Sequence, residues 1–219
     1  MLLPLHRRLA VKAEPILPQR TVELGLIAIL FHDTGYLKQR GDDSGTGAKY
    51  TVTHVSRSAE FAAKFLDGKN FLAREILAIQ NMIRCTGVDA TLNNIQFQDD
   101  AEKITGHILG TADLLGQMAA DDYVEKLPIL YAEFAEAAAF SGHKASVVSM
   151  FSSAKDLMQK TPTFWDNYVK LKLTRDFSGQ FRYFNDPYPD GPNWYIAKIE
   201  ANLDRLRQWL ANNTSTFRK

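Results

Sequence analysis

The pattern of apolar and polar positions is helical along almost the whole chain. Apolar residues recur at spacings of three and four, and no segment alternates convincingly as a β-strand would. We see no repeat, low-complexity linker or break in composition, so the sequence predicts one all-α domain over residues 1–219. The helices are expected at about 5–17, 21–32, 53–66, 71–86, 100–119, 122–138, 144–158, 161–178 and 192–211.

The first two segments predict how the chain enters its core. His6, Leu9, Ala13 and Leu17 fall on one stripe of the first helix, so His6 is expected to face inward. Prolines at 15 and 18 are expected to end that helix. The segment 21–32 is apolar nearly all round, which predicts a buried central helix.

A histidine and an aspartate, His32 and Asp33, stand side by side where this apolar run ends, and Gly35 then breaks the helix. Adjacent helical residues point about 100° apart, so the two side chains can share a small target only where the backbone opens. A divalent metal is such a target, because imidazole and carboxylate both ligate it. The alternative is a histidine that only satisfies the helix C-terminus.

The stretch between Gly35 and Tyr50 is polar and contains three more glycines, at 41, 45 and 47. The composition predicts a mobile surface loop directly after the His-Asp pair. It is either a plain linker or a lid over a site.

The helix expected at 100–119 carries a second signal. Gly106, Gly110 and Asp113 lie on one face of it, and each interior glycine costs about 1 kcal/mol relative to alanine. That cost indicates a tight helix contact or room for an occupied site. Asp113 stands among apolar neighbours, where an unpaired carboxylate is expensive, so it requires a metal ion or a salt bridge with Arg57 or Arg84.

Composition narrows the class of protein. The 219 residues are 45% hydrophobic and 23% charged, as in ordinary soluble domains, and 26 basic residues balance 25 acidic ones. A formal charge of +1 gives no reason to expect a nucleic-acid or membrane partner. The single cysteine, Cys85, the short apolar runs and the lack of a signal-peptide pattern lead us to expect a cytoplasmic protein.

Taken together, these residues resemble the HD-domain metal-dependent phosphohydrolases. The resemblance rests on Phe31-His32-Asp33-Thr34-Gly35-Tyr36, Thr53-His54-Val55-Ser56-Arg57-Ser58-Ala59, Met82-Ile83-Arg84-Cys85-Thr86 and Ala112-Asp113-Leu114-Leu115. It implies an HD-type helical core over about residues 5–120. Residues 121–219 would be a C-terminal helical extension with no motif that we can name.

The resemblance also implies the roles of individual residues. A divalent ion (Mn, Mg, Fe, Ni, Co or Zn) would be bound by His6, His32, Asp33 and Asp113. Its bound water would attack a phosphate ester of a nucleotide or related small molecule, with His54 and Asp33 as catalytic residues. Candidate phosphate contacts are Lys38, Arg57 and Arg84. A homodimer is left open, and neither a membrane nor a nucleic acid is expected as a partner.

Two departures from the family pattern leave other functions open. His6 precedes His32 by only 26 residues, and Val55 stands where many relatives have a glutamate after the histidine. The first alternative is an HD-type di-iron oxygenase, whose site His54 would complete. The second is a degenerate HD module that binds a nucleotide or a partner without turnover.

Overall fold

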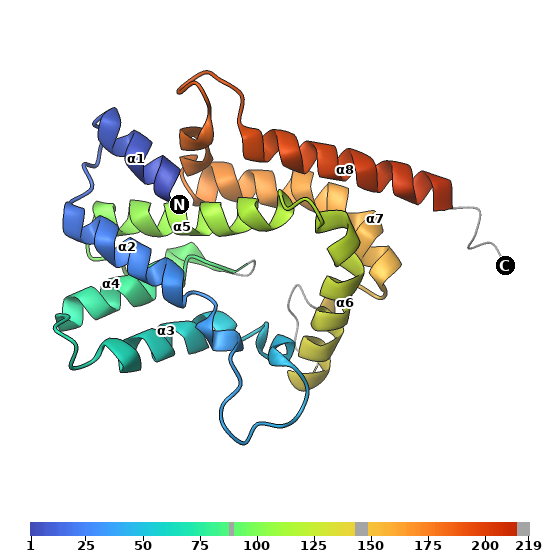
Figure 1. Ribbon diagram of the computed structural model, residues 1–219, viewed down its shortest axis with the longest axis horizontal. Coiled ribbons are helices and arrows are strands. Elements are labelled where there is room, and N and C mark those ends of the chain that lie inside the picture. The colour runs from blue at the N-terminus through green and yellow to red at the C-terminus, as the bar shows by residue number, and fades with distance from the viewer. Residues whose placement is uncertain (88–89, 143–148, 214–219) are drawn as a thin grey trace.

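The computed structural model describes residues 1–87, 90–142 and 149–213 and confirms the all-α fold (Figure 1). Within these residues, the only β-type pairing is one isolated bridge between Asn185 and Asn193. The helices are α1 Leu2–Ala10, α2 Gln19–Phe31, α3 His54–Leu66, α4 Ala73–Ile83, α5 Asp100–Met118, α6 Tyr123–Phe140, α7 Ala154–Phe164 and α8 Trp194–Asn213.

Helix α5 is the central element of the fold. It begins where Asp99 caps it, since the Asp99 carboxylate accepts a hydrogen bond of 2.7 Å from the Glu102 amide. Both hydrophobic halves of the molecule use α5 side chains: Leu109 packs with α2, α3 and α4, whereas Leu115 packs with α6, α7 and α8. Figure 1 shows α5 running through the middle of the ribbon.

Helix α2 was expected to be the buried centre, and this prediction was wrong. Its Leu24 and Ala28 are buried, but Leu30 is 77% exposed. An all-round apolar helix can lie at the surface because apolar atoms cover much of any protein surface. The helix that is buried on most sides is α5, although its mean apolar character is lower than that of α2.

The glycines of α5 allow a close contact between helices. This is one of the two explanations that the sequence offered for them, the other being room for an occupied site. A Cβ atom on Gly110 would lie 2.5 Å from the carbonyl oxygen of Cys85 and 2.7 Å from the Phe177 ring. One on Gly106 would lie 2.7 Å from the Cys85 sulfur. The end of α4 and the aromatic Phe177 can therefore approach α5 only because these two positions lack side chains.

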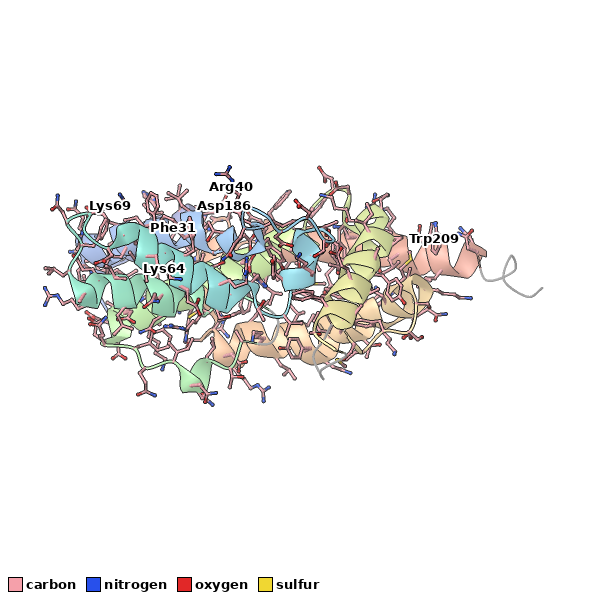
Figure 2. The ribbon with its side chains drawn as sticks, turned by 90° about the horizontal axis from the view of Figure 1, so that it is seen from below. Phe31, Arg40, Lys64, Lys69, Asp186 and Trp209 are labelled. Atoms are coloured by element: carbon pink, nitrogen blue, oxygen red, sulfur yellow. The ribbon has the colours of Figure 1, made fainter. Side chains whose placement is uncertain are left out.

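Helices α2 and α4 pack against one side of α5, and α3 packs on α4 and α2. The buried face of α3 is made of small residues, Ser58, Ala59 and Ala62, ending in Leu66. The aromatic residues Phe61 and Phe65, which share a stripe with His54 in the sequence, are nearly half exposed. Figure 2 shows the side chains on this side of the molecule, with Phe31 and Lys64 labelled.

The C-terminal half forms a separate hydrophobic cluster centred on Trp165, Val169, Leu173 and Leu203. The break expected near residue 160 is absent, because α7 continues through the π-helical turns η5 (Trp165–Val169) and η6 (Lys172–Asp176). Leu157, Thr161 and Trp165 are spaced by four residues and all buried, so one face continues past the expected break. Residues 144–148 of the predicted helix 144–158 lie outside the described residues.

Helix α1 ends at Ala10, earlier than the predicted residue 17. The backbone turns at Lys12, where φ is +50°, and Pro15 follows. The buried face of α1 consists of Pro4, Leu5 and Arg8. His6 is exposed, so the expectation that it faces inward was wrong.

None of the described helices is long and apolar enough to cross a membrane.

Candidate functional site

The His-Asp pair lies where α2 ends and the 3-10 turn η1 (Thr34–Tyr36) begins. This turn is held against α3 by its glycine. The Gly35 amide donates a 2.8 Å hydrogen bond to the Ser58 hydroxyl, and the Gly35 carbonyl accepts one of 2.7 Å from Arg57 Nε. A Cβ at Gly35 would lie 2.0 Å from the carbonyl oxygen of His54, so only glycine fits here.

His32 lies between two carboxylates that come from different elements. Its Nε2 is 3.2 Å from Asp33 Oδ2 and 3.6 Å from Asp113 Oδ1 on α5. The other ring nitrogen, Nδ1, lies 2.7 Å from the carbonyl oxygen of Ile29, one turn back on α2. This backbone contact fixes the ring orientation and turns Nε2 toward the two carboxylates.

The surroundings of His32 favour the protonated, positively charged form of its ring. Burial opposes protonation, but the hydrogen bond to Asp113, the Ile29 carbonyl and the negative charges of Asp33 and Asp113 outweigh it. Together they raise the pKa of His32 to about 9. Without another cation, the imidazolium itself therefore balances the two carboxylates at neutral pH.

His54 opens α3 beside this group, and its ring is fixed on both sides. Its Nδ1 lies 2.6 Å from the carbonyl oxygen of Thr51, and its ring stacks on Tyr36 with centroids 4.3 Å apart. Burial lowers the pKa of His54 below the usual value for histidine. With Nδ1–H donating to Thr51, a neutral His54 ring presents Nε2 as an acceptor.

Asp33, Tyr36, His54 and Asp113 line a cavity of about 520 Å³, within the usual size range of small-molecule sites. Helix α6 contributes Leu130, Glu133 and Phe134 to its wall. Phe177 and the buried Lys172 reach it from the C-terminal half. The polar residues that line the cavity include Asp33, Tyr36, Thr51, His54, Arg84, Thr86, Thr91, Asn94, Asp113, Gln117, Glu133 and Lys172.

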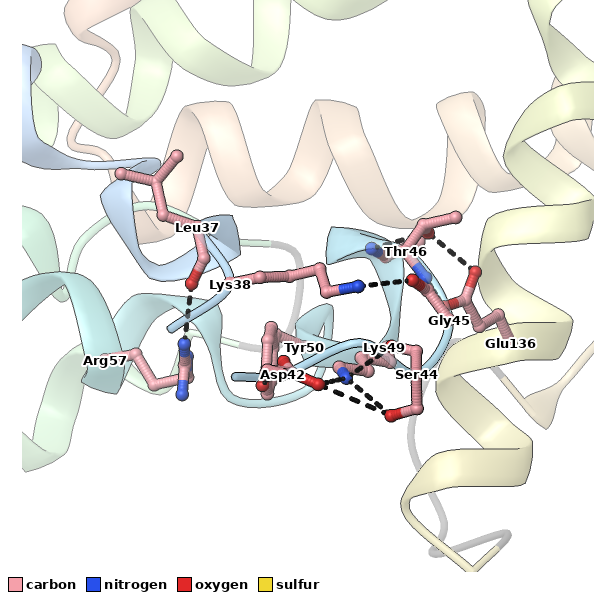
Figure 3. Close-up of polar contacts among 11 residues, drawn as sticks. Leu37, Lys38, Asp42, Ser44, Gly45, Thr46, Lys49, Tyr50, Arg57 and Glu136 are labelled. Carbon is pink, nitrogen blue, oxygen red and sulfur yellow. Dashed lines mark hydrogen bonds and ion pairs between the residues drawn. The ribbon is translucent and has the colours of Figure 1, made fainter. Parts of the chain in front are cut away.

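The polar loop after η1 is tied down at several points, although the sequence predicts a mobile segment (Figure 3). Lys38 donates to the carbonyl of Gly45, and the buried Lys49 ammonium pairs with the Asp42 carboxylate. The Thr46 amide and hydroxyl donate to Glu136 on α6, at 2.5 and 2.7 Å. The loop thereby links the η1 side of the cavity to α6.

Replacing Glu136 with alanine is expected to release this loop. The Thr46 hydroxyl and amide lower the pKa of Glu136, so the contact holds above the ordinary pKa of glutamate. It weakens as the pH falls through the lowered pKa, when the carboxylate is protonated. Amide hydrogen exchange across residues 38–50 should become several-fold faster in Glu136→Ala at neutral pH. Glu133→Ala, one turn earlier on α6, is the matched control, and equal exchange in both variants would contradict the anchoring role.

The structure brings together four of the residues proposed from the sequence and separates others from them. His32 lies between Asp33 and Asp113, and the cavity is lined by Asp33, His54, Arg84 and Asp113. His6 is exposed on α1, which packs against the turn η7 (Gln180–Phe184) and α5, and it does not line the cavity.

Two of the candidate phosphate contacts are engaged elsewhere. Arg57 donates to the carbonyls of Gly35 and Leu37 and stacks on Tyr50, so its guanidinium holds η1 in place. Lys38 is exposed on the loop and bonded to Gly45. Neither residue lines the cavity.

Most of the residues that line the cavity were not predicted from the sequence, among them the titratable Tyr36, Glu133 and Lys172. Tyr36 belongs to the motif Phe31-His32-Asp33-Thr34-Gly35-Tyr36 but received no role. Glu133 and Lys172 lie in helices whose surroundings offer no motif. For Lys172, the one signal in the sequence was that a lysine stands directly between two leucines, Leu171 and Leu173.

Within the described residues, no group of three or more His, Cys, Asp or Glu side chains is arranged ready to hold a metal ion. Nε2 of His32 faces both Asp33 and Asp113, the arrangement that a protonated imidazole makes with two carboxylates. The donor types and the aim of Nε2 nevertheless fit a divalent ion. Two ligands of one ion, each bonded at about 2.1 Å, lie about 3.0 Å apart in octahedral and about 3.4 Å apart in tetrahedral geometry.

Comparison with known proteins identifies the family of the chain. No curated relative and no solved structure matches it. Residues 23–178, more than half of the chain, match the Npun_R2479-like family. Every residue that lines the cavity, from Asp33 to Phe177, lies inside this range, whereas His6 lies before it. The chain therefore belongs to the Npun_R2479-like family.

Proposed function

We propose that this protein is a metal-dependent phosphohydrolase that cleaves a phosphate ester of a nucleotide or related small molecule. The observation that carries the proposal is His32 held between Asp33 and Asp113, two carboxylates that line a small-molecule cavity. The two separations, 3.2 and 3.6 Å, are close to those expected between neighbouring ligands of one ion. The resemblance of the surrounding motifs to HD-domain phosphohydrolases supports the same reaction.

His32, Asp33 and Asp113 would hold the ion, which replaces the proton of His32 as the cation between the two carboxylates. When bound, the metal would lower the pKa of a coordinated water and polarise a phosphoryl oxygen. His6 has no place in this proposal, since its side chain is exposed on α1. Three protein ligands leave coordination positions for water and substrate, as catalysis requires.

His54 would move the proton. Its lowered pKa keeps the ring neutral near pH 7, so Nε2 can accept a proton from the attacking water and return it to the leaving alcohol. The Thr51 carbonyl and the stacked Tyr36 ring fix its position, which reduces the cost of orienting the base. Glu133 lines the same cavity and offers a further carboxylate. This carboxylate could serve where many HD-domain phosphohydrolases have a glutamate and this chain has Val55.

The walls of the cavity would select the organic part of the substrate. Leu114, Leu130, Phe134 and Phe177 give it an apolar side that can cover a base or another flat group. The same residues keep bulk water away from the reacting phosphate, which strengthens the electrostatic contacts around it.

The proposal is tested by metal analysis together with a substrate panel. The full chain is purified without chelator, its metal content is measured, and phosphomonoesters, phosphodiesters and nucleotides are assayed with Mn²⁺, Mg²⁺, Co²⁺, Ni²⁺ and Fe²⁺. We expect close to one ion or more per chain, and hydrolysis that stops with a chelator and returns with added metal. A protein that takes up none of these ions would overturn the proposal.

A second candidate, binding without turnover, is favoured by the position of His6 and by Val55. It predicts that nucleotides bind in the cavity and are not hydrolysed with any of the five ions. The substrate panel separates the two functions when binding is measured on the same samples.

A further inference from the structure

A second part of the cavity wall is basic. Arg84, just after α4, and Lys172, in η6, both line the cavity that His54 and Asp113 line. The Lys172 ammonium donates a 2.9 Å hydrogen bond to the carbonyl of Ala90, which places it at the connection between α4 and α5. Thr86, Thr91 and Asn94 of that connection line the cavity as well and add hydroxyl and amide groups to its wall.

Arg84 is oriented by a chain of buried side chains. Its Nη1 donates a 2.9 Å hydrogen bond to the Asn81 side-chain oxygen. The Asn81 amide group in turn donates to Glu102 at 2.7 Å and to the carbonyl of Gln96 at 3.0 Å. Asn81 and Glu102 are each 3% exposed, so the support of the guanidinium is rigid. In the described parts of the chain, no carboxylate lies within ion-pair distance of Arg84, which leaves its remaining donors for a ligand.

Lys172 is only 4% exposed, so its charge is held inside the protein. The ammonium lies over the rings of Tyr168 and Phe177, 5.8 and 5.5 Å from their centroids, and 3.9 Å from Asp176. Rigid aromatic neighbours and the Ala90 carbonyl fix where the charge sits. Water screens a buried charge less than an exposed one, so this ammonium, which also faces Asp176, can still attract an anion that enters the cavity.

We infer that Arg84 and Lys172 form an oxyanion subsite, so that the ligand of the cavity carries a second anionic group besides the phosphate bound near His32, Asp33 and Asp113. The substrate class is then a small phosphate ester with a further phosphate or a carboxylate, such as a nucleoside diphosphate or a phosphorylated acid. The presence of a cleaved phosphate rests on the proposed function. The subsite itself does not, because its two cations would bind an oxyanion whether or not hydrolysis follows.

The subsite is tested on metal-free full-length protein, with inorganic pyrophosphate as the probe and isothermal titration calorimetry as the measurement. We expect Arg84→Gln and Lys172→Met each to weaken pyrophosphate binding about tenfold or more, since a charge-assisted hydrogen bond is lost in each. Arg74→Gln, at the other end of α4, and Lys170→Met, two residues from Lys172, remove exposed cations that do not line the cavity. These two controls should bind as the wild type does.

Because Lys172 is buried, thermal melts are recorded for each variant, and Lys172→Arg is added as the charge-preserving form. If Lys172→Met does not fold, Arg84→Gln and Lys172→Arg decide. Pyrophosphate binding unchanged in Arg84→Gln, or seen only after Mn²⁺ is added, would overturn the subsite. A protein without metal or hydrolysis whose pyrophosphate binding still depends on Arg84 would refute the proposed function and leave the subsite in place.

Discussion

Asp113→Asn should abolish stable metal binding while the protein stays folded. The substitution keeps the size of the side chain but removes the charge that faces His32 Nε2 from α5. Loss of a group that only orients a ligand already costs about 10–100-fold in metal affinity, so loss of the ligand itself should cost more than about 100-fold. Hydrolysis of any phosphoester that the wild type cleaves should fall at least as far.

The measurement is metal content per chain by mass spectrometry, after equal exposure of wild type and variant to Mn²⁺ and removal of free ion. Asp100→Asn is the matched control, because Asp100 is exposed in the first turn of the same helix and does not line the cavity. Asp113 is about one-third exposed, so its replacement should leave the melting temperature within a few degrees of the wild type. Metal content equal in Asp113→Asn and wild type would refute the assignment of these ligands.

The helices could be predicted from the sequence wherever one face of them is buried continuously. The caps helped as well: the sequence offers Asp99 or Asp100 as the residue that begins α5, and Asp99 does so by accepting the Glu102 amide hydrogen bond. The ends of α1 and the course of α7 were missed because they depend on tertiary contacts. Pro162 lies inside α7 although proline disfavours a helix interior. The burial of Leu157, Thr161 and Trp165 on one face offsets this cost.

The candidate site divides along the same line. His32 and Asp33 are adjacent in sequence, and Asp113 lies on a face marked by two costly glycines, so local signals identified them. Lys172 and Glu133 reach the cavity through the tertiary packing of η6 and α6 in the C-terminal hydrophobic cluster, which no local pattern records. The prediction that His6 faces inward was wrong because it depended on a local pattern alone. That pattern included Ala13 and Leu17, which lie beyond the end of the helix at Ala10.

Gly35→Ala should destabilise the protein by about 3 kcal/mol, the upper range for overpacking, and lower its melting temperature by about 6–12 °C. The added methyl group would lie 2.0 Å from the carbonyl oxygen and 2.7 Å from the carbonyl carbon of His54. Backbone cannot rotate away as a side chain can, so η1 must move off α3. That movement also breaks the hydrogen bonds that Gly35 makes with Ser58 and Arg57.

The same displacement should disturb the site, since η1 positions Asp33 at one end and Tyr36 at the other. We therefore expect Gly35→Ala to lose metal as well as stability, measured by thermal melts and metal content at a temperature where the variant is folded. Gly116→Ala is the matched control: a Cβ there meets nothing within 4 Å, and alanine in a helix is favoured over glycine by about 1 kcal/mol. Its melting temperature should equal or exceed that of the wild type. Equal melting temperatures for Gly35→Ala and Gly116→Ala would contradict this prediction. They would mean that η1 has room for a methyl group beside His54 and that Gly35 does not fix the position of Asp33.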